Sequence, residues 1–350
     1  MECTTETLKM LENDSAVRIF NVVLSLPAVQ ALHVAHELNL FELIGAENAL
    51  SLDALSKTLH LQLRPLQALL SMCMGLDLIT LNNNDNGCFA LTDTAKNFLL
   101  KESPFYLGKA LEVNLMNAEI FSFKSLKKAL LENNSQIYAG KELFKTNEEQ
   151  AELAKNFTRC MHGKSMGMAG QWPNKIDLSK NKSLLDIGGG SGAHSISAVL
   201  RWPNLKATVY ERPTAAEIAE EYIEQFELKN RIQTHIGDMF QDPFPPSDIH
   251  FYSDIFHDWP METCRFLVQK SYDALKPKGR IVIHEMLFND NKTGPYSVAC
   301  YNIMMLLWTQ SGQQLSRKEL VGLLKESGFI NIKVTPTGLG DWSLIEGQKA

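Results

Sequence analysis

The chain has 350 residues, of which 45% are hydrophobic, and it carries a formal net charge of −6. This length exceeds the size at which one hydrophobic core stops growing, so we expect two packed units. The acidic balance disfavours nucleic acid and anionic membranes as partners. The first 14 residues are polar, and no run of 18 uncharged apolar residues occurs, which predicts a soluble, cytoplasmic protein with no membrane partner.

The first hundred residues predict three helices followed by a hairpin. Apolar side chains recur at helical spacing over residues 17–44, where Pro27 is expected to start or kink a helix. Shorter helices follow at 51–59, after a capping serine, and at 64–74, with a proline in the first turn. Two short apolar runs, 78–81 and 88–91, flank a polar loop and predict a β-hairpin. This order is typical of a winged-helix domain.

A winged helix commonly binds DNA through basic and amide side chains on its third helix. Here that helix carries a single basic residue, Arg64, among Leu, Met and Cys side chains. Such a surface suits packing against protein. We therefore expect dimerisation or substrate enclosure from this region, ahead of DNA contact.

The remaining chain divides into a helical segment and an α/β segment. Residues 105–170 read as helical throughout, and from residue 182 short apolar runs alternate with amphipathic helices, which predicts a largely parallel sheet covered on both faces. The predicted domains are therefore residues 1–105, 106–175 and 176–350. Six scattered cysteines without a C-x-x-C pair predict reduced thiols and no metal site.

A glycine-rich turn follows the first strand of the α/β segment. The strand contains Asp186, and Gly188 and Gly190 begin a G-x-G-x-G turn that leads directly into a helix. Glycines at the carboxyl end of a strand let a ligand approach the backbone closely. The dinucleotide fingerprint is G-x-G-x-x-G instead, so the turn alone is weak evidence.

Acidic residues at the next two strand ends predict a nucleoside site. Glu211 lies about 20 residues after the turn, where a carboxylate can accept hydrogen bonds from both ribose hydroxyls. Asp238 and Met239 follow the third strand and can offer an acceptor for an exocyclic amine and an apolar face for a base. The residues at three strand ends together therefore predict one nucleoside site.

These residues resemble the class I S-adenosylmethionine-dependent methyltransferases, whose first motif matches LLDIGGGSG with the downstream acid. The runs SDIFHDW, ending at Trp259, and ALKPKGRIVIHE, ending at Glu285, narrow the resemblance to the small-molecule O-methyltransferases, which include acetylserotonin, caffeic acid and anthracycline enzymes. The resemblance covers almost the whole chain. It implies a Rossmann-like methyltransferase sheet with an N-terminal α-helical winged-helix dimerisation domain, a homodimer, and S-adenosylmethionine as cofactor with S-adenosylhomocysteine as product.

The chemistry needs a base that removes the proton of the acceptor hydroxyl. The His of the family's HDW motif is that base, and His257 stands in its place, with Glu285 resembling the glutamate that orients it. The family usually has a second glutamate in a G-x-E-R-T segment, where this chain has Gln314. An amide can hydrogen-bond a substrate but cannot stabilise an imidazolium by charge. The change either weakens the base, or suits an acidic acceptor, or marks loss of methyl transfer.

The resemblance also implies further residues that contact the cofactor and the acceptor. Arg212 and Asp254 are expected beside the cofactor, although related enzymes often carry Lys or Arg at position 254. The acceptor pocket is expected to include Phe157 and Met161 of the helical bridge and Asn302 and Met305 of the helix after the fifth strand, which suits a flat, mostly apolar small molecule with one reactive hydroxyl.

Two other functions stay open from the sequence. Some members of the resembling family bind the same cofactor and catalyse hydroxylation or decarboxylation. A winged-helix regulator that senses the nucleoside is disfavoured by the low basic content and by the paired His257 and Glu285.

Overall fold

A computed structural model describes residues 15–82, 87–137 and 150–350. The chain divides into two compact units, Met1–Leu115 and Met116–Ala350, and each is described by itself. The domain boundaries expected from the sequence, at 105/106 and 175/176, stay predictions.

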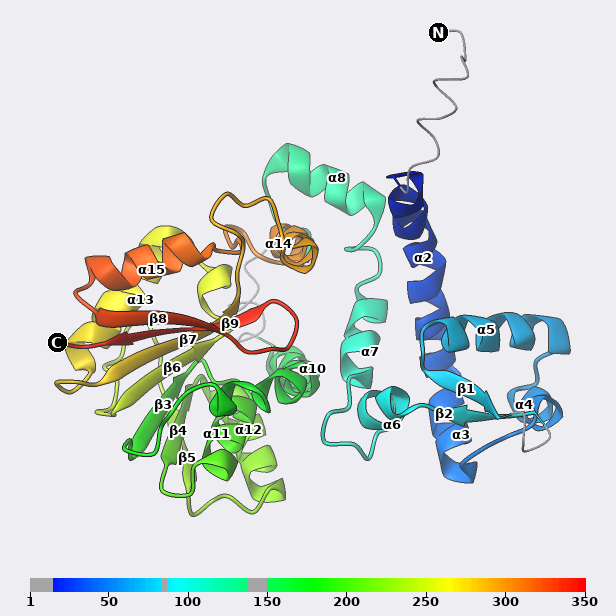
Figure 1. Ribbon diagram of the computed structural model, residues 1–350, viewed down its shortest axis with the longest axis horizontal. Coiled ribbons are helices and arrows are strands. Elements are labelled where there is room, and N and C mark those ends of the chain that lie inside the picture. Colours follow the sequence, from blue (N-terminus) through cyan, green and yellow to red (C-terminus); the bar gives the residue numbers. More distant parts are fainter. Residues whose placement is uncertain (1–14, 83–86, 138–149) are drawn as a thin grey trace, which may run out of the picture. The chain divides into compact units, whose positions relative to one another are not determined.

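The first unit consists of helices and one hairpin (Figure 1). Its elements are α2 (Ser15–Glu37), α3 (Leu40–Glu47), α4 (Leu52–Leu59), α5 (Leu63–Gly75), β1 (Ile79–Asn82), β2 (Cys88–Leu91), α6 (Asp93–Leu99) and α7 (Gly108–Met116), the last of which ends one residue into the second unit. Strands β1 and β2 pair antiparallel, from Ile79 with Leu91 to Asn82 with Cys88, as predicted. Four described helices, α2 to α5, precede the hairpin where three were expected, and the assignment of this region as a winged helix stays a prediction.

The expectation of one helix over residues 17–44 is wrong. Asn39 has a left-handed backbone conformation, with φ of 53°, and this residue separates α2 from α3. Asn tolerates this conformation better than most residues because its short polar side chain can bond locally. Pro27 lies inside α2, so it does not start the helix, and the expected kink stays a prediction.

Helix α2 exposes most of its apolar side chains in the single chain. Val17, Ile19, Phe20, Val22, Val23, Leu24, Leu26 and Val29 are each more than half exposed. By length and composition, Ala16–Glu37 is the one helix of the described residues that could cross a membrane, which alone is weak evidence. An apolar surface of this extent on a soluble protein typically marks a protein interface.

Helices also precede the sheet in the second unit. α8 (Phe123–Glu132) ends where Asn133 takes a left-handed conformation, with φ of 50°, and α10 spans Ala151–Ala169. The expectation of continuous helix from 105 to 170 is therefore wrong at residues 117–122 and 133–136, and residues 138–149 lie outside the described structure.

The second unit is built on a seven-stranded, mostly parallel sheet with the order β5-β4-β3-β6-β7-β9-β8 (Figure 1). The strands are β3 (Ser183–Ile187), β4 (Lys206–Glu211), β5 (Ile232–Ile236), β6 (Ile249–Ser253), β7 (Arg280–Met286), β8 (Ile330–Pro336) and β9 (Trp342–Gln348). β9 pairs antiparallel with both β7 and β8. The strand order reverses at β3, and such a switch point is where open α/β sheets bind ligands.

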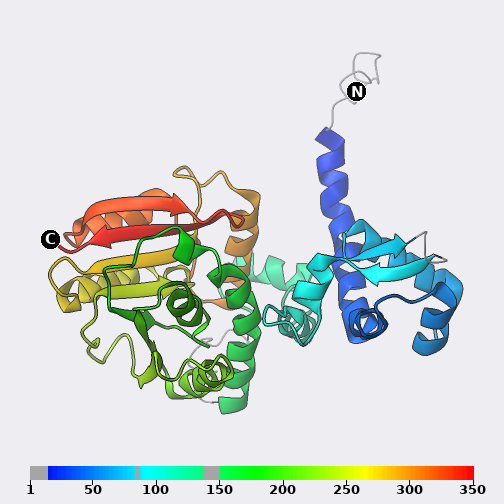
Figure 2. The same ribbon diagram turned by 60° about the horizontal axis from the view of Figure 1, so that its bottom comes forward.

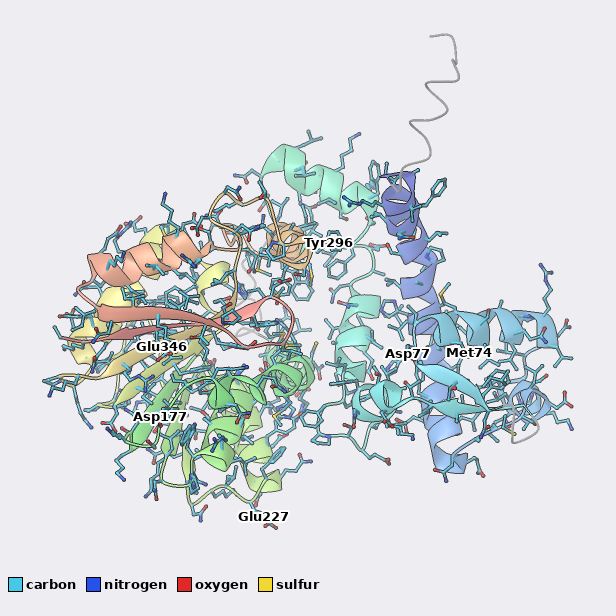
Figure 3. All side chains as sticks on the ribbon, viewed as in Figure 1. Met74, Asp77, Asp177, Glu227, Tyr296 and Glu346 are labelled. Carbon is cyan, nitrogen blue, oxygen red and sulfur yellow. The ribbon has the colours of Figure 1, made fainter. Side chains whose placement is uncertain are left out.

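Helices cover both faces of this sheet, as the two views show (Figures 1 and 2). α13 (Met261–Ala274) and α15 (Arg317–Glu326) pack on one core, and α11 (Ala193–Arg201) and α12 (Pro213–Gln225) pack on the other. Alternation along β3 sends Leu185 and Ile187 to the first core and Leu184 to the second. α14 (Tyr296–Trp308) starts with Tyr296, which is labelled in Figure 3 and 74% exposed. The expected α/β architecture is therefore confirmed.

Candidate active site

The glycine-rich turn leaves space at the carboxyl end of β3. Gly188 and Gly190 have φ of +66° and +55°, a backbone conformation that favours glycine. A side chain at Gly188 would collide with Ile255, and its Cβ would lie 3.8 Å from Glu211 Oε2. A Cβ built on Gly190 meets nothing within 4 Å. The turn therefore brings the end of β3 beside Glu211 and keeps open space over Gly190.

Asp186 lies beneath this turn and is 1% exposed. Ser195 Oγ donates to its Oδ2 at 2.7 Å, while its Oδ1 has no hydrogen-bond partner in the described structure. Burial raises the pKa of Asp186 to about 7, and the nearby Glu211 adds to the rise. A buried oxygen without a partner is costly, and a bound donor would relieve that cost.

The acids at the next two strand ends face different partners. Glu211 ends β4, and burial raises its pKa, opposed by hydrogen bonds from the backbone N–H groups of Arg212 and Gly190. Arg212 donates to Asp238 Oδ2 at 2.6 Å, so two of the expected cofactor residues bond each other. The Met239 carbonyl accepts a hydrogen bond from Lys270 at 2.7 Å, which fixes the backbone beside Asp238.

His257 lies on η4 (Phe256–Asp258), directly after β6, and is 4% exposed. Its Nδ1 lies 2.7 Å from Glu285 Oε2, at the end of β7, and Glu285 Oε1 accepts from the backbone N–H groups of Ile255 and Phe256. The carboxylate therefore holds both the ring and its loop. Because a carboxylate can only accept, Nδ1 carries the hydrogen and Nε2 is the nitrogen left to take a proton.

The charge around His257 favours its protonated form. Burial opposes the charge, but Glu285 and then Asp258 raise the pKa of His257 to about 9. Burial in turn raises the pKa of Asp258 to about 7, opposed by His257. The adjacent His284 lies on the other face of β7, where Ser253 bonds its Nδ1 and Trp342 stacks on its ring.

Asp254 pairs with a lysine that the sequence analysis did not identify. Lys164 of α10 donates to Asp254 Oδ2 at 2.8 Å and to the Tyr301 hydroxyl of α14. Lys164 lies three residues after Met161 and seven after Phe157, on the helix face expected to line the pocket. The sequence places Lys164 on that face and an acid at position 254, but no local pattern in the sequence joins the two.

His162 and Ser191 were also missed. His162 Nδ1 lies 2.8 Å from the hydroxyl of Ser191 in the glycine-rich turn, and its ring stacks on Tyr222 with centroids 3.4 Å apart. Burial lowers the pKa of His162 to about 4, so this histidine is neutral and links α10 to the turn.

Asp254, His257 and Glu285 offer ligand atoms within 4.8 Å of one another, a spacing that could hold a metal ion. Two of those groups already bond each other, and Lys164 supplies the positive charge beside the third. We therefore assign no metal to this cluster.

The expected acceptor residues come together in part. Asn302 Oδ1 accepts from the Gln314 backbone N–H at 2.8 Å, and the Phe157 ring contacts the Trp308 ring with centroids 6.4 Å apart. Met161 is partly exposed and Met305 is buried. Gln314 is 1% exposed, and both amide atoms of its side chain lack a hydrogen-bond partner within the described residues.

Comparisons with known proteins match this architecture. An O-methyltransferase domain matches residues 123–330, and an O-methyltransferase dimerisation domain matches residues 20–101. Acetylserotonin O-methyltransferase of Gallus gallus is 28% identical over 88% of this chain and 90% of its own. The 3-hydroxy-5-methyl-1-naphthoate 3-O-methyltransferase of Streptomyces sahachiroi is 27% identical over 92% of each chain.

A solved structure has the same fold. Human N-acetylserotonin methyltransferase in complex with SAM superposes with a TM-score of 0.84, covering 97% of this chain and 99% of its own at 24% identity. The two domain matches cover most of the chain in the order expected from the sequence. The chain therefore belongs to the O-methyltransferase family, and it is an S-adenosylmethionine-dependent enzyme of that family.

Proposed function

We propose that this enzyme methylates a hydroxyl of a small aromatic or natural-product acceptor, with His257 as the general base. The observation that carries the proposal is the 2.7 Å contact between His257 Nδ1 and Glu285 Oε2, which leaves Nε2 to accept the hydroxyl proton. Relatives named for acetylserotonin and for a hydroxynaphthoate support the acceptor class.

The cofactor supplies an electrophilic methyl group on a sulfonium. The acceptor oxygen attacks it in line, so the protein's task is alignment and removal of the hydroxyl proton. His257 takes that proton at Nε2, and Glu285 stabilises the resulting imidazolium across the Nδ1 hydrogen bond. In this scheme Gln314 leaves Glu285 as the main charge partner at Nδ1, since an amide carries no charge.

The cofactor is proposed to lie over the glycine-rich turn. Glu211 would accept hydrogen bonds from the ribose hydroxyls, and the orphaned Asp186 Oδ1 and the open space over Gly190 fit a ligand there. Gly188 would let the ligand approach the backbone. The remaining proposed contacts come from the ends of β5 and β6 and from the start of α12, namely Asp238, Met239, Asp254 and Arg212.

The acceptor is proposed to contact α10 and α14, through Phe157, Met161, Asn302 and Met305. The unpartnered Gln314 amide supports a polar contact in the same place, because a ligand with both a donor and an acceptor would satisfy it. This favours an acceptor that carries a second polar group in addition to the reactive hydroxyl.

We also propose a cytoplasmic homodimer. The dimerisation-domain match and the exposed apolar side chains of α2 support self-association. Cys73, Cys88, Cys264 and Cys300 form no disulfide among the described residues, as suits a reducing compartment. A boundary between the dimerisation domain and a helical bridge at residue 105 is part of the same proposal.

Two measurements on the purified protein test the function. Calorimetry with S-adenosylmethionine and with S-adenosylhomocysteine measures cofactor binding, and the methyl-labelled cofactor with a panel of phenols and hydroxyindoles measures transfer. We expect binding of both nucleosides and label in a phenolic product. Binding without transfer to any acceptor favours the hydroxylase or decarboxylase alternative, and absence of binding overturns the proposal.

A further inference from the structure

A partly buried ion pair lies next to the proposed base. Lys164 and Asp254 have side chains that are 21% and 13% exposed, and the ammonium of Lys164 contacts both the Asp254 carboxylate and the Tyr301 hydroxyl. Burial opposes the charge on each partner, yet each holds the other charged: Asp254 raises the pKa of Lys164, and Lys164 lowers the pKa of Asp254. The pair is therefore a fixed dipole in the wall of the site.

Asp254 faces the base as well as the lysine. Its Oδ1 lies 3.8 Å from His257 Nδ1, and this oxygen has no hydrogen-bond partner among the described residues. Asp254 also takes a left-handed backbone conformation, with φ of 57°, which is unfavourable for a residue with a side chain. The carboxylate is thus held beside a ring nitrogen that Glu285 already occupies.

The groups around His257 come from four elements and one connecting segment. Glu285 lies on β7, Asp258 lies on η4 and 3.7 Å from Nε2, and Asp254 lies between β6 and η4. The Tyr301 ring of α14 meets the imidazole edge on, with centroids 5.5 Å apart, and Lys164 comes from α10. Three carboxyl groups therefore surround one imidazole, and Lys164 is the cation paired with one of them.

We propose that Lys164 is a positioning residue that pairs with Asp254 and so keeps this carboxylate from adding to the negative charge that already favours the protonated form of His257. Without the lysine, Asp254 is free to pair with His257 Nδ1 in competition with Glu285. An additional uncompensated carboxylate at 3.8 Å would stabilise the imidazolium, and an imidazolium cannot act as a base. The role deepens the proposed function and rests on His257 being the base.

The pairing of Asp254 with a lysine from another element supports a dedicated role for Lys164. Asp254 lies between β6 and η4, and the cation that pairs with it stands on a different element, α10. An isolated buried acid at that position would be costly, and removing one partner of a buried pair typically destabilises the protein strongly. The charges at positions 164 and 254 therefore depend on each other in this protein.

Nuclear magnetic resonance titration of the His257 ring tests the proposal without any turnover. The full chain is titrated without acceptor, and the His257 signal is identified by its loss in His257→Ala. We expect Lys164→Met to raise the titration midpoint of His257 by about one pH unit or more, because it frees the Asp254 charge. Asp254→Asn should lower the midpoint.

The double variant shows whether Lys164 acts through Asp254. In the Asp254→Asn background, Lys164→Met should move the midpoint much less than in the native background. Lys155→Met is the matched control, since Lys155 lies on the same helix and pairs with a different acid, the exposed Glu217, and it should leave the midpoint unchanged. An unchanged or lower midpoint in Lys164→Met, or an equal effect in both backgrounds, overturns the proposal.

A second, more conservative variant keeps the test valid if Lys164→Met fails to fold. Lys164→Gln retains hydrogen-bond donors for Asp254 and Tyr301 but removes the charge, so its midpoint should also rise. These outcomes are separate from the proposed function: full transfer by His257→Ala would refute the base, whereas the ring titration reports the Lys164 effect whether or not transfer occurs.

Discussion

His257 and Glu285 form a buried pair in which a carboxylate bonds the imidazole and the two backbone N–H groups that precede it. One side chain therefore fixes the ring, its tautomer and the loop that carries it. This arrangement also raises the pKa of His257 to about 9, against the effect of burial. The base is consequently strong but largely protonated at neutral pH in the absence of ligands.

Transfer should therefore depend on pH in a defined direction. The neutral imidazole is the active form, so kcat/KM should rise with pH, about tenfold per unit below pH 9, and level off above it. The raised pKa also stabilises the fold: that contribution is complete below about pH 6.5 and is lost as pH rises through 9. A pH–rate profile measures the first effect, and a profile that falls from pH 6 to pH 8, in the range about one to three units below that pKa, would contradict the assignment.

Glu211 should control cofactor affinity. Its replacement by Ala removes the proposed ribose acceptor, and the loss of about 1–3 kcal/mol corresponds to a roughly tenfold to hundredfold weaker binding of S-adenosylhomocysteine. Calorimetry measures the change. Glu224→Ala is a suitable control because Glu224 is an exposed acid paired with Lys229. Equal affinities in both variants would remove Glu211 from the site.

Gly87 is a suitable control for Gly190, because the two glycines have similar local geometry. Both have positive φ, and a Cβ on either meets nothing within 4 Å. Alanine at either position should lower the free energy of unfolding by about 1–2 kcal/mol, because the backbone conformation is unfavourable for it. We expect weaker cofactor binding in Gly190→Ala alone. If Gly87→Ala weakens binding equally, the space over Gly190 is not the cofactor site.

The apolar surface of α2 should mediate self-association. Phe20 and Val23 are 64% and 63% exposed and lie on neighbouring turns. Sedimentation should give twice the chain mass of 39.3 kDa for the native protein and a lighter species for Val23→Asp. Leu200→Asp, at an exposed position of α11, should remain a dimer. A native protein that sediments as a monomer at micromolar concentration would refute the dimer.

Local sequence signals predicted the elements more reliably than the places where they break. The hairpin and the strand ending in Glu211 follow from apolar runs and turn residues, and the structure has them at those positions. The break at Asn39 was missed because a left-handed asparagine leaves the apolar periodicity of the flanking residues intact. Asn133 ended a helix in the same way.

Site residues could be predicted where they lie at the carboxyl end of a predicted strand. His257 and Glu285 were paired in advance by resemblance, and their contact follows from adjacent parallel strands β6 and β7. Lys164 was not, since its partner lies 90 residues away and no local pattern joins a helix face to a strand end. The partners of Asp254 could only be read from the folded chain.

Replacement of His257 by Ala tests the central claim most directly. At saturating cofactor and a fixed phenolic acceptor, the rate of methyl transfer should fall by about 10² to 10⁴, while the affinity for S-adenosylhomocysteine stays nearly unchanged. His235→Ala, an exposed histidine on β5, should keep the native rate. A His257→Ala enzyme that transfers methyl groups at the native rate would contradict the account.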